Sequence, residues 1–533
     1  MERMAASYFK ELYTKDPTLD PIPVLDTLLP KVSPETNDRL LAPFSDKEIS
    51  DALFQIGPLK APGPDGFPAR FFQRNWGCLK EDIVLAVHRF FETGQMPSGV
   101  NDTSIVLIPK VQHPTTLKEL RPISLCNVIY KVVSKCLVNR LRPCLTDLIS
   151  ENQSAFIPGR LISDNSIIAF ECIHHIQSNA GNADFCAYKL DLSKAYDRVD
   201  WDYLEGALLR WGFAPRWVSL VMVCVRSVKF SVKFNGRLLE QFIPTRGIRQ
   251  GDPLSPFLFL FVADSLSSLL HTAVQHGGLE ALQICRRALA ISHLLFADDS
   301  LFFFRADMEN ATIVKDVLNT YASATGQLIN PSKCSILFPE SCSPQVADDV
   351  KLVLEITQQA FEPKYLGLPV PEGRMHKGRF ESLQARVSKS LIEWSERYSS
   401  YSGKEVLIKV VAQAIPVYVM SIFKLPVAVC DELSKMMRPF WWGVENGRRK
   451  MAWVAWDRLS LPKARGGLSF RDMQAYNQAL LAKQAWRLLT TLESLCARLL
   501  KAKYYPNGNL VDTVFPSNSS VVWKGIEHGL ALV

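Results

Sequence analysis

Two adjacent carboxylates, Asp298 and Asp299, stand between two runs of large apolar residues in the stretch HLLFADDSLFFF, residues 293–304. Like charges side by side cost free energy unless water, a cation or a turn accommodates them. The flanking runs 294–297 and 301–304 have the composition of strands, so we predict a tight hairpin with the aspartate pair at its tip. A solvated surface turn also explains such a pair. A catalytic role requires a third carboxylate in the same sheet.

A third carboxylate follows another predicted strand. Residues 185–190 have a strand pattern, and Asp191 comes directly after them, where the chain turns toward a helix. Neighbouring strands lie about 5 Å apart, so carboxylates at their ends can share cations. Two divalent cations can activate a hydroxyl, orient a triphosphate and stabilise a leaving pyrophosphate. The three aspartates therefore predict polymerase chemistry with two Mg²⁺ or Mn²⁺ ions.

The remaining pattern up to residue 375 mixes helices and strands. Residues 1–45 are rich in proline and predict a loosely ordered lead-in. A helix is expected from Ser45, because Glu48 completes a capping box. Further strands include a hairpin around Asn235-Gly236. This order favours an α+β fold, with a sheet layer covered by helices on one face.

Beyond Arg374 the strand signals end, and a separate helical region is expected. One amphipathic stripe comprises Phe380, Leu383, Val387, Leu391, Trp394 and Tyr398.

Residues 376–465 also carry much of the positive charge. This stretch contains 16 Lys or Arg against 8 Asp or Glu, and the whole chain has a net charge of +8. Five of the eleven tryptophans lie in it: Trp394, Trp441, Trp442, Trp453 and Trp456. Basic residues interleaved with aromatic rings suit a phosphate backbone and stacked bases. A helical domain whose Lys and Arg only solvate its outer faces explains the composition equally well.

The sequence does not indicate a disulfide-linked, zinc-binding, membrane-spanning or secreted protein. The 12 cysteines include no C-x-x-C pair, and the nine histidines, His174 and His175 among them, show no zinc-ligand spacing. No apolar stretch reaches the length of a membrane span, and the N-terminus is not a signal peptide. We therefore expect a reduced, intracellular protein with no membrane partner.

Five motifs occur together in the order found in one known family. KLDLSKAYDRVDW, RGIRQGDPLSPFLF, LLFADD, GQLINPSKCSIL and KYLGLPV resemble the palm motifs of reverse transcriptases of LINE-type (non-LTR) retrotransposons. Upstream, KAPGPDG and LRPISLCNVIYKVVSKCLVNRLRP resemble the fingers of the same family. The resemblance implies a right-hand polymerase fold with a helical C-terminal extension. It also implies RNA-directed DNA synthesis from an RNA template, a DNA primer and dNTPs.

The resemblance assigns roles residue by residue. Asp191, Asp298 and Asp299 would be the metal ligands, and Tyr196 would close on the sugar of the incoming nucleotide. The other positions are Gln250 and Gly251, which would line the nucleotide and template pocket, Lys110 and Arg121, which would face the triphosphate, and Lys333, a candidate general acid near the leaving pyrophosphate. Asp197 is expected to be a structural hydrogen-bonding residue, and Lys110 and Lys333 could equally be ordinary exposed lysines.

The implied domains are a lead-in (1–45), fingers (46–183), palm (184–375), a basic helical thumb (376–490) and a C-terminal extension (491–533). Full-length relatives add an endonuclease domain and a Cys/His module, so we expect a polymerase fragment of a longer element, acting in the nucleus. Two alternatives stay open. One is a catalytically idle nucleic-acid-binding remnant. The other is an RNA-dependent RNA polymerase, whose usual hairpin has Gly-Asp-Asp where this chain has Ala297 before the pair.

Overall fold

A four-stranded antiparallel sheet lies at the centre of the fold. The computed structural model describes residues 2–178, 184–373, 375–395, 400–445 and 448–533. The strand order is β6-β7-β3-β8, with β6 (His293–Phe296), β7 (Asp299–Arg305), β3 (Phe185–Leu190) and β8 (Ser335–Leu337). The predicted hairpin is confirmed, because β6 and β7 pair antiparallel up to Phe296 and Asp299. The predicted strand 185–190 is also confirmed, and it pairs with β7.

Helices cover both faces of this central sheet, so the expectation of helices on one face is wrong. Along β7, Phe302 and Phe304 belong to one hydrophobic core, and Leu301 and Phe303 belong to another. Successive side chains of a strand point to opposite faces, so the unbroken LFFF run is buried on both sides. One core includes α10 (Trp201–Arg210), α11 (Pro215–Arg226), α12 (Ser255–Gln275), α13 (Met308–Thr325) and α14 (Pro344–Val353). The other includes α9 (Ile162–Gln177) and the C-terminal helices.

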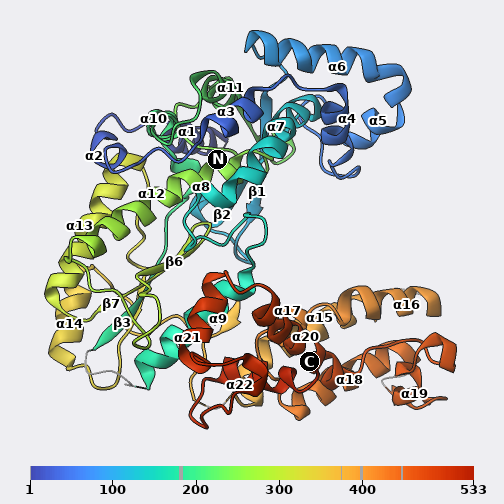
Figure 1. The fold of residues 1–533 in the computed structure, drawn as a ribbon. Helices are drawn as coiled ribbons and strands as arrows, with labels where there is room; N and C mark the ends of the chain where they lie inside the picture. The colour runs from blue at the N-terminus through green and yellow to red at the C-terminus, as the bar shows by residue number, and fades with distance from the viewer. Residues whose placement is uncertain (1, 179–183, 374, 396–399, 446–447) are drawn as a thin grey trace.

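A second sheet lies toward the N-terminal side, with strand order β2-β1-β4-β5. Its strands are β1 (Asp102–Pro109), β2 (Leu120–Cys126), β4 (Lys229–Phe234) and β5 (Arg237–Leu238). The predicted Asn235-Gly236 hairpin joins β4 to β5, and both turn residues have positive φ, as a type I′ turn requires. Helices α4 (Asp46–Phe54), α5 (Ala69–Arg74), α6 (Trp76–Thr93), α7 (Val128–Leu141) and α8 (Leu145–Leu148) accompany this sheet (Figure 1). The capping box of Ser45 and Glu48 at the start of α4 is confirmed.

The lead-in, residues 1–45, is packed rather than loosely ordered. It forms α1 (Glu2–Leu12), α2 (Ile22–Leu25) and α3 (Pro34–Leu41). Phe9 and Tyr13 are buried with Phe230 of β4 in a small third core. The prolines stand in turns and at helix starts, where they do not prevent packing. The apolar residues between the prolines pack against residues that are far away in the sequence. The local sequence pattern therefore does not indicate that they are buried.

The C-terminal helices do not form a separate unit. They are α15 (Glu381–Ser395), α16 (Tyr401–Leu407), α17 (Val417–Met420), α18 (Val427–Trp442), α19 (Trp456–Ser460), α20 (Met473–Thr490), α21 (Leu495–Tyr504) and α22 (Val521–Leu530). They share one core with α9 and one face of the central sheet. Arg487 of α20 makes a two-pronged ion pair with Asp164 of α9, at 2.8 Å for each oxygen. In α9, the buried Glu171 accepts hydrogen bonds from Lys503, Tyr504 and Ser520.

Only short strand pairs occur beyond the central sheet in the described C-terminal residues. They are β9 (Lys364–Tyr365) with β10 (Leu368–Pro369), and β11 (Val444–Glu445) with β12 (Arg448–Arg449). Most of the predicted amphipathic stripe is confirmed, because Phe380, Leu383, Val387 and Leu391 are buried. Tyr398 of that stripe lies outside the described residues.

Helix α12 is long and apolar enough to cross a membrane by length and composition alone, which the sequence analysis missed. Within the fold, 67% of its most apolar window is buried. This helix also carries the buried Asp264, paired with Lys31 of the lead-in at 2.9 Å. The length and composition of α12 therefore agree with a core helix of this fold.

Candidate active site

The three predicted carboxylates lie at adjacent strand ends. Leu190 pairs with Ser300 across β3 and β7, so Asp191 follows at the level of Asp299. The hairpin between β6 and β7 (residues 293–305, called here the aspartate hairpin) turns through Ala297 and Asp298. Ala297 has a φ of +56°, whereas Asp298 is not in the positive region, which is the pattern of a type II′ turn. The antiparallel pairing of β3 with β7 therefore brings all three aspartates to one end of the sheet.

Asp191 is directed toward the loop that precedes β8. Its Oδ2 accepts a hydrogen bond from Asn330 Nδ2 at 3.1 Å and lies 4.0 Å from Lys333 Nζ. Asn330 N also donates to the backbone oxygen of Asp191 at 2.9 Å. Among the described residues, no group of three or more His, Cys, Asp or Glu side chains is gathered closely enough to hold a metal ion. A cation shared by the three aspartates would therefore require their side chains to move closer together.

The electrostatics show that the carboxylates interact. Burial and the charge of Asp298 raise the pKa of Asp299 to about 6. Burial and the charge of Asp191 also raise the pKa of Asp298, while Arg121 and Lys110 oppose this rise. A bound divalent cation would offset the repulsion among these groups. The donor set, three carboxylates of which two have raised pKa values, thus fits a hard cation.

Tyr196 lies against the aspartate hairpin. Its ring stacks on that of Phe259, with centroids 4.8 Å apart and planes at 13°. Burial, and in second place the charge of Asp298, raise the pKa of the Tyr196 phenol. The ring is therefore held in a fixed plane within electrostatic range of Asp298.

Gln250 and Gly251 belong to a loop fixed against β2. Ser124 N donates to the backbone oxygen of Gln250 at 2.8 Å. Gly251 has a φ of +113°, and a Cβ there would lie 2.9 Å from the Ser124 oxygen. Only glycine fits this close backbone approach.

A buried ion pair holds this loop. Arg249 Nη2 lies 3.0 Å from Asp252 Oδ2, and both side chains are about 95% buried. Asp252 also accepts hydrogen bonds from Tyr130 and Ser134, each at 2.7 Å. Arg249 donates to the Cys224 oxygen at 3.1 Å. The conformation of residues 249–252 is therefore set by groups on α7 and α11.

Asp197 is a hydrogen-bonding residue, as expected. Tyr13 donates to its Oδ1 at 2.9 Å, and Gln250 Nε2 lies 3.3 Å from the same oxygen. Burial raises the pKa of Asp197 to about 6. The lead-in thus contributes Tyr13 to the support of Gln250.

A basic pocket of about 750 Å³ opens beside Asp191. It brings together Lys110 and Lys333, which the sequence analysis assigned to phosphate contacts. The other charged residues that line it are Glu11, Lys118, Glu119, Lys194, Arg198 and Arg246. Burial, followed by the charges of Lys333 and Arg121, lowers the pKa of Lys110. The three cations Lys110, Arg121 and Lys333 therefore act on one region, which suits a polyanion such as a triphosphate.

Sequence reasoning missed several residues of this site. Asn330 lies within the GQLINPSKCSIL motif, three residues before Lys333, and this position was the available signal. Lys194 also lies within a quoted motif; it lines the pocket, and burial lowers its pKa to about 8. Tyr13 gave no signal, because its partner Asp197 is 184 residues away.

Three carboxylates at one end of an antiparallel sheet, with several lysine and arginine side chains nearby, are typical of a nucleic-acid polymerase. Residues 108–370 match the family model described as "Reverse transcriptase (RNA-dependent DNA polymerase)". These residues therefore form a reverse transcriptase domain, and the resemblance to the non-LTR branch is confirmed.

Similar proteins include products of mobile elements and a mitochondrial protein. A 149 kDa protein of transposon TX1 from Xenopus laevis is 32% identical over 340 residues, 63% of this chain and 25% of that protein. A Pol polyprotein of a type-2 retrotransposable element from Drosophila melanogaster is 27% identical over 298 residues, 56% of this chain and 26% of its own length. An uncharacterized mitochondrial protein of Arabidopsis thaliana is 40% identical over 121 residues, 22% of this chain and 79% of that protein. The chain thus spans about a quarter of the length of the two mobile-element relatives.

Proposed function

We propose that this chain is an RNA-directed DNA polymerase of a non-LTR retrotransposon, extending a primer 3′ hydroxyl with dNTPs on an RNA template. The observation that carries the proposal is the pairing of β3 with β7, which brings Asp191 to the same end of the sheet as Asp298 and Asp299. The charges of Lys110 and Arg121 act on Asp298, and Lys333 lies near Asp191. The central sheet would be the palm, residues 46–183 the fingers, and the basic C-terminal helices the thumb. Helices α4–α6 and α15–α19 both extend from the central sheet toward the same side (Figure 1).

The three aspartates would hold two Mg²⁺ or Mn²⁺ ions. When bound, such ions lower the pKa of the primer hydroxyl and neutralise charge on the phosphates. The remaining steps belong to the chain's own residues. Lys110 and Arg121 would bind the triphosphate, Tyr196 would border its sugar, and Gln250 and Gly251 would contact the base and template. Lys333 would give its Nζ proton to the leaving pyrophosphate.

Sugar selection gives a test of the DNA-synthesis assignment. The Tyr196 phenol would collide with a 2′ hydroxyl, and its stacking on Phe259 keeps it from moving aside. We expect Tyr196→Val to raise ribonucleotide incorporation by roughly a hundredfold, while dNTP use falls by about tenfold or less. Single-nucleotide extension with dNTPs and rNTPs measures both. Tyr196→Phe, which keeps the ring, is the matched control. Unchanged sugar selectivity in Tyr196→Val would rule out this role for Tyr196, and equal use of rNTPs and dNTPs by the parent chain would favour the RNA polymerase alternative.

The basic region 376–465 would hold the template–primer duplex mainly through charge. Of its five tryptophans, Trp441 and Trp456 are buried, and Trp453 is 79% exposed. Most of these rings therefore pack within the fold, and Trp453 is the candidate for base stacking.

Salt dependence tests this region in the full chain. Replacing the exposed Arg386, Lys389, Lys435 and Arg438 of α15 and α18 with Gln should weaken duplex binding. If each contacts a phosphate, the slope of log affinity against log salt should become less steep by about 0.9 per residue. A matched variant removes four exposed charges elsewhere, at Arg210, Lys229, Lys233 and Arg237. Equal salt slopes in the two variants would contradict the proposed duplex site.

A polymerase of this kind would act in the nucleus on an RNA template and a DNA primer, with no membrane partner. Extension of a DNA primer on an RNA template by the purified chain is the direct test of the proposal.

A further inference from the structure

A partly buried segment, residues 149–155, supports the aspartate hairpin. Gln153 is fully buried, and its Oε1 accepts hydrogen bonds from Ala297 N and Ala155 N, each at 3.0 Å. Ser154 N donates to the Leu295 oxygen at 3.1 Å, and Leu295 N donates to the Asn152 oxygen at 2.9 Å. The segment thus adds to the free edge of β6 and ends at the hairpin tip.

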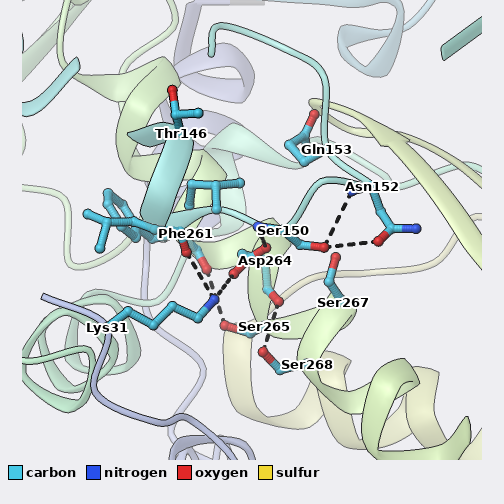
Figure 2. Close-up of polar contacts among 12 residues, drawn as sticks. Lys31, Thr146, Ser150, Asn152, Gln153, Phe261, Asp264, Ser265, Ser267 and Ser268 are labelled. Atoms are coloured by element: carbon cyan, nitrogen blue, oxygen red, sulfur yellow. Dashed lines mark hydrogen bonds and ion pairs between the residues drawn. The ribbon is translucent and has the colours of Figure 1, made fainter. Parts of the chain in front are cut away.

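The segment is itself anchored deep in the fold. Figure 2 shows Asp264 of α12 between Lys31 of the lead-in and Ser150. Ser150 N donates to Asp264 Oδ1 at 2.8 Å, and Lys31 Nζ lies 2.9 Å from Asp264 Oδ2. Arg160 donates to the backbone oxygens of Gln153 at 2.7 Å and Ile149 at 2.8 Å. Because these contacts come from three separate elements, Gln153 is presented to the hairpin from a rigid support.

The hairpin tip needs such support because its backbone is strained. Ala297 has a φ of +56°, at the turn position where glycine is preferred. The left-handed region costs an L-residue with a Cβ about 1–2 kcal/mol. Without a compensating contact, the turn would relax to negative φ and move Asp298, the next residue. The Ala297 N–H, however, is bound directly by Gln153.

We propose that Gln153 is a positioning residue for the reaction: by accepting the Ala297 N–H, it holds the strained turn that presents Asp298 and Asp299. Gln153 contacts neither substrate nor cation and acts only through the hairpin. Both acceptor positions of its Oε1 are used, so its loss removes the partner of the buried Ala155 N–H and of the partly buried Ala297 N–H. The catalytic consequence of this inference rests on the proposed function, whereas the effect on hairpin geometry does not.

The test combines loss of the Gln153 contact with relief of the backbone strain. Gln153→Met keeps the volume and removes the acceptor. We expect the turnover number of primer extension to fall by about ten- to a hundredfold, because a displacement near 1 Å has effects of this order. The dNTP KM should stay within about threefold of the parent value. The double variant Gln153→Met/Ala297→Gly should turn over at least about fivefold faster than Gln153→Met alone, because glycine adopts positive φ without strain. Ala297→Gly alone should leave turnover within about twofold.

A control separates positioning from general loss of stability. Tyr203 is fully buried in α10 and donates to Ser265, and neither residue belongs to the hairpin or to residues 149–155. Tyr203→Phe should therefore lower the melting temperature, as Gln153→Met does, but leave turnover unchanged. Gln153→Asn, with a shorter side chain, should show a smaller loss of turnover than Gln153→Met, and Ala297→Gly should restore turnover in it as well. This variant replaces Gln153→Met if Gln153→Met folds poorly.

Hydrogen exchange provides a readout that does not depend on activity. The backbone amides at Ala297–Asp299 should exchange at least about tenfold faster in Gln153→Met than in the parent chain. The inference would be overturned if Gln153→Met had the same turnover number and the same amide exchange rates as the parent chain. It would also be overturned if Gln153→Met lost turnover and Ala297→Gly did not restore it. A parent chain without extension activity, but with faster hairpin exchange in the variant, would contradict the proposed function and support the positioning role.

Discussion

Asp298→Asn should abolish primer extension while leaving the fold intact. The substitution keeps the size of the side chain and removes a charge that raises the pKa of Asp299. Loss of a proposed metal ligand at the reacting centre should remove several kcal/mol of transition-state stabilisation, so we expect turnover to fall by roughly a thousandfold or more. Asp191→Asn should have an effect of the same order. Steady-state extension of a labelled primer measures both.

Thermal unfolding supplies the control for these variants. Burial and repulsion by Asp191 raise the pKa of Asp298, so its charged form is disfavoured in the folded chain. The neutral asparagine should therefore unfold at the same or a higher temperature than the parent at neutral pH in metal-free buffer. Mg²⁺ should stabilise the parent more than the variant. Asp316→Asn, on the exposed side of α13, should match the parent in both assays. Undiminished synthesis by Asp298→Asn would remove this residue from the site.

Asp252→Ala should produce the largest loss of stability from a single change near the site. It would leave Arg249 as an uncompensated buried charge and remove the acceptor of Tyr130 and Ser134. Breaking a buried pair from one side costs about 3–5 kcal/mol. We therefore expect a clear fall in melting temperature, together with loss of extension because the Gln250-Gly251 loop is released.

The matched control breaks an exposed ion pair. Asp202 is 58% exposed and forms surface ion pairs with Arg226, at 2.9 Å, and with Lys15. Pairs of this kind contribute about 1 kcal/mol or less, so Asp202→Ala should change the melting temperature little. Equal effects of the two substitutions would contradict the assigned role of the Arg249–Asp252 pair.

Local signals in the sequence predicted the elements that carry the chemistry. The hairpin at Asp298-Asp299, the strand before Asp191 and the capping box at Ser45 each depend on residues close together in the chain. Local composition is sufficient for such features, because turn and cap preferences act over a few residues. The site assignments of Lys110, Arg121, Lys333, Gln250 and Gly251 came from the family resemblance and stay predictions.

The parts that the sequence did not predict depend on distant contacts. The hydrogen bond from Tyr13 to Asp197 spans 184 residues, and that from Ala297 to Gln153 spans 144. No periodic pattern marks either partner. The burial of both faces of β7 was available from the unbroken LFFF run. The helices that cover the two faces, however, come from different parts of the chain: α10–α14 on one face, and α9 with the C-terminal helices on the other. The lead-in was judged by its prolines, and its buried residues meet their partners only in the folded chain.

DNA synthesis on RNA at the three aspartates is tested most directly by extension of one labelled DNA primer on one RNA template with Mg²⁺, comparing dNTPs with rNTPs and the parent chain with Asp298→Asn. We expect template-dependent extension by the parent with dNTPs, little extension with rNTPs, and none above background by the variant. Absence of extension by the folded parent in both Mg²⁺ and Mn²⁺, or equal extension by parent and variant, would contradict this expectation.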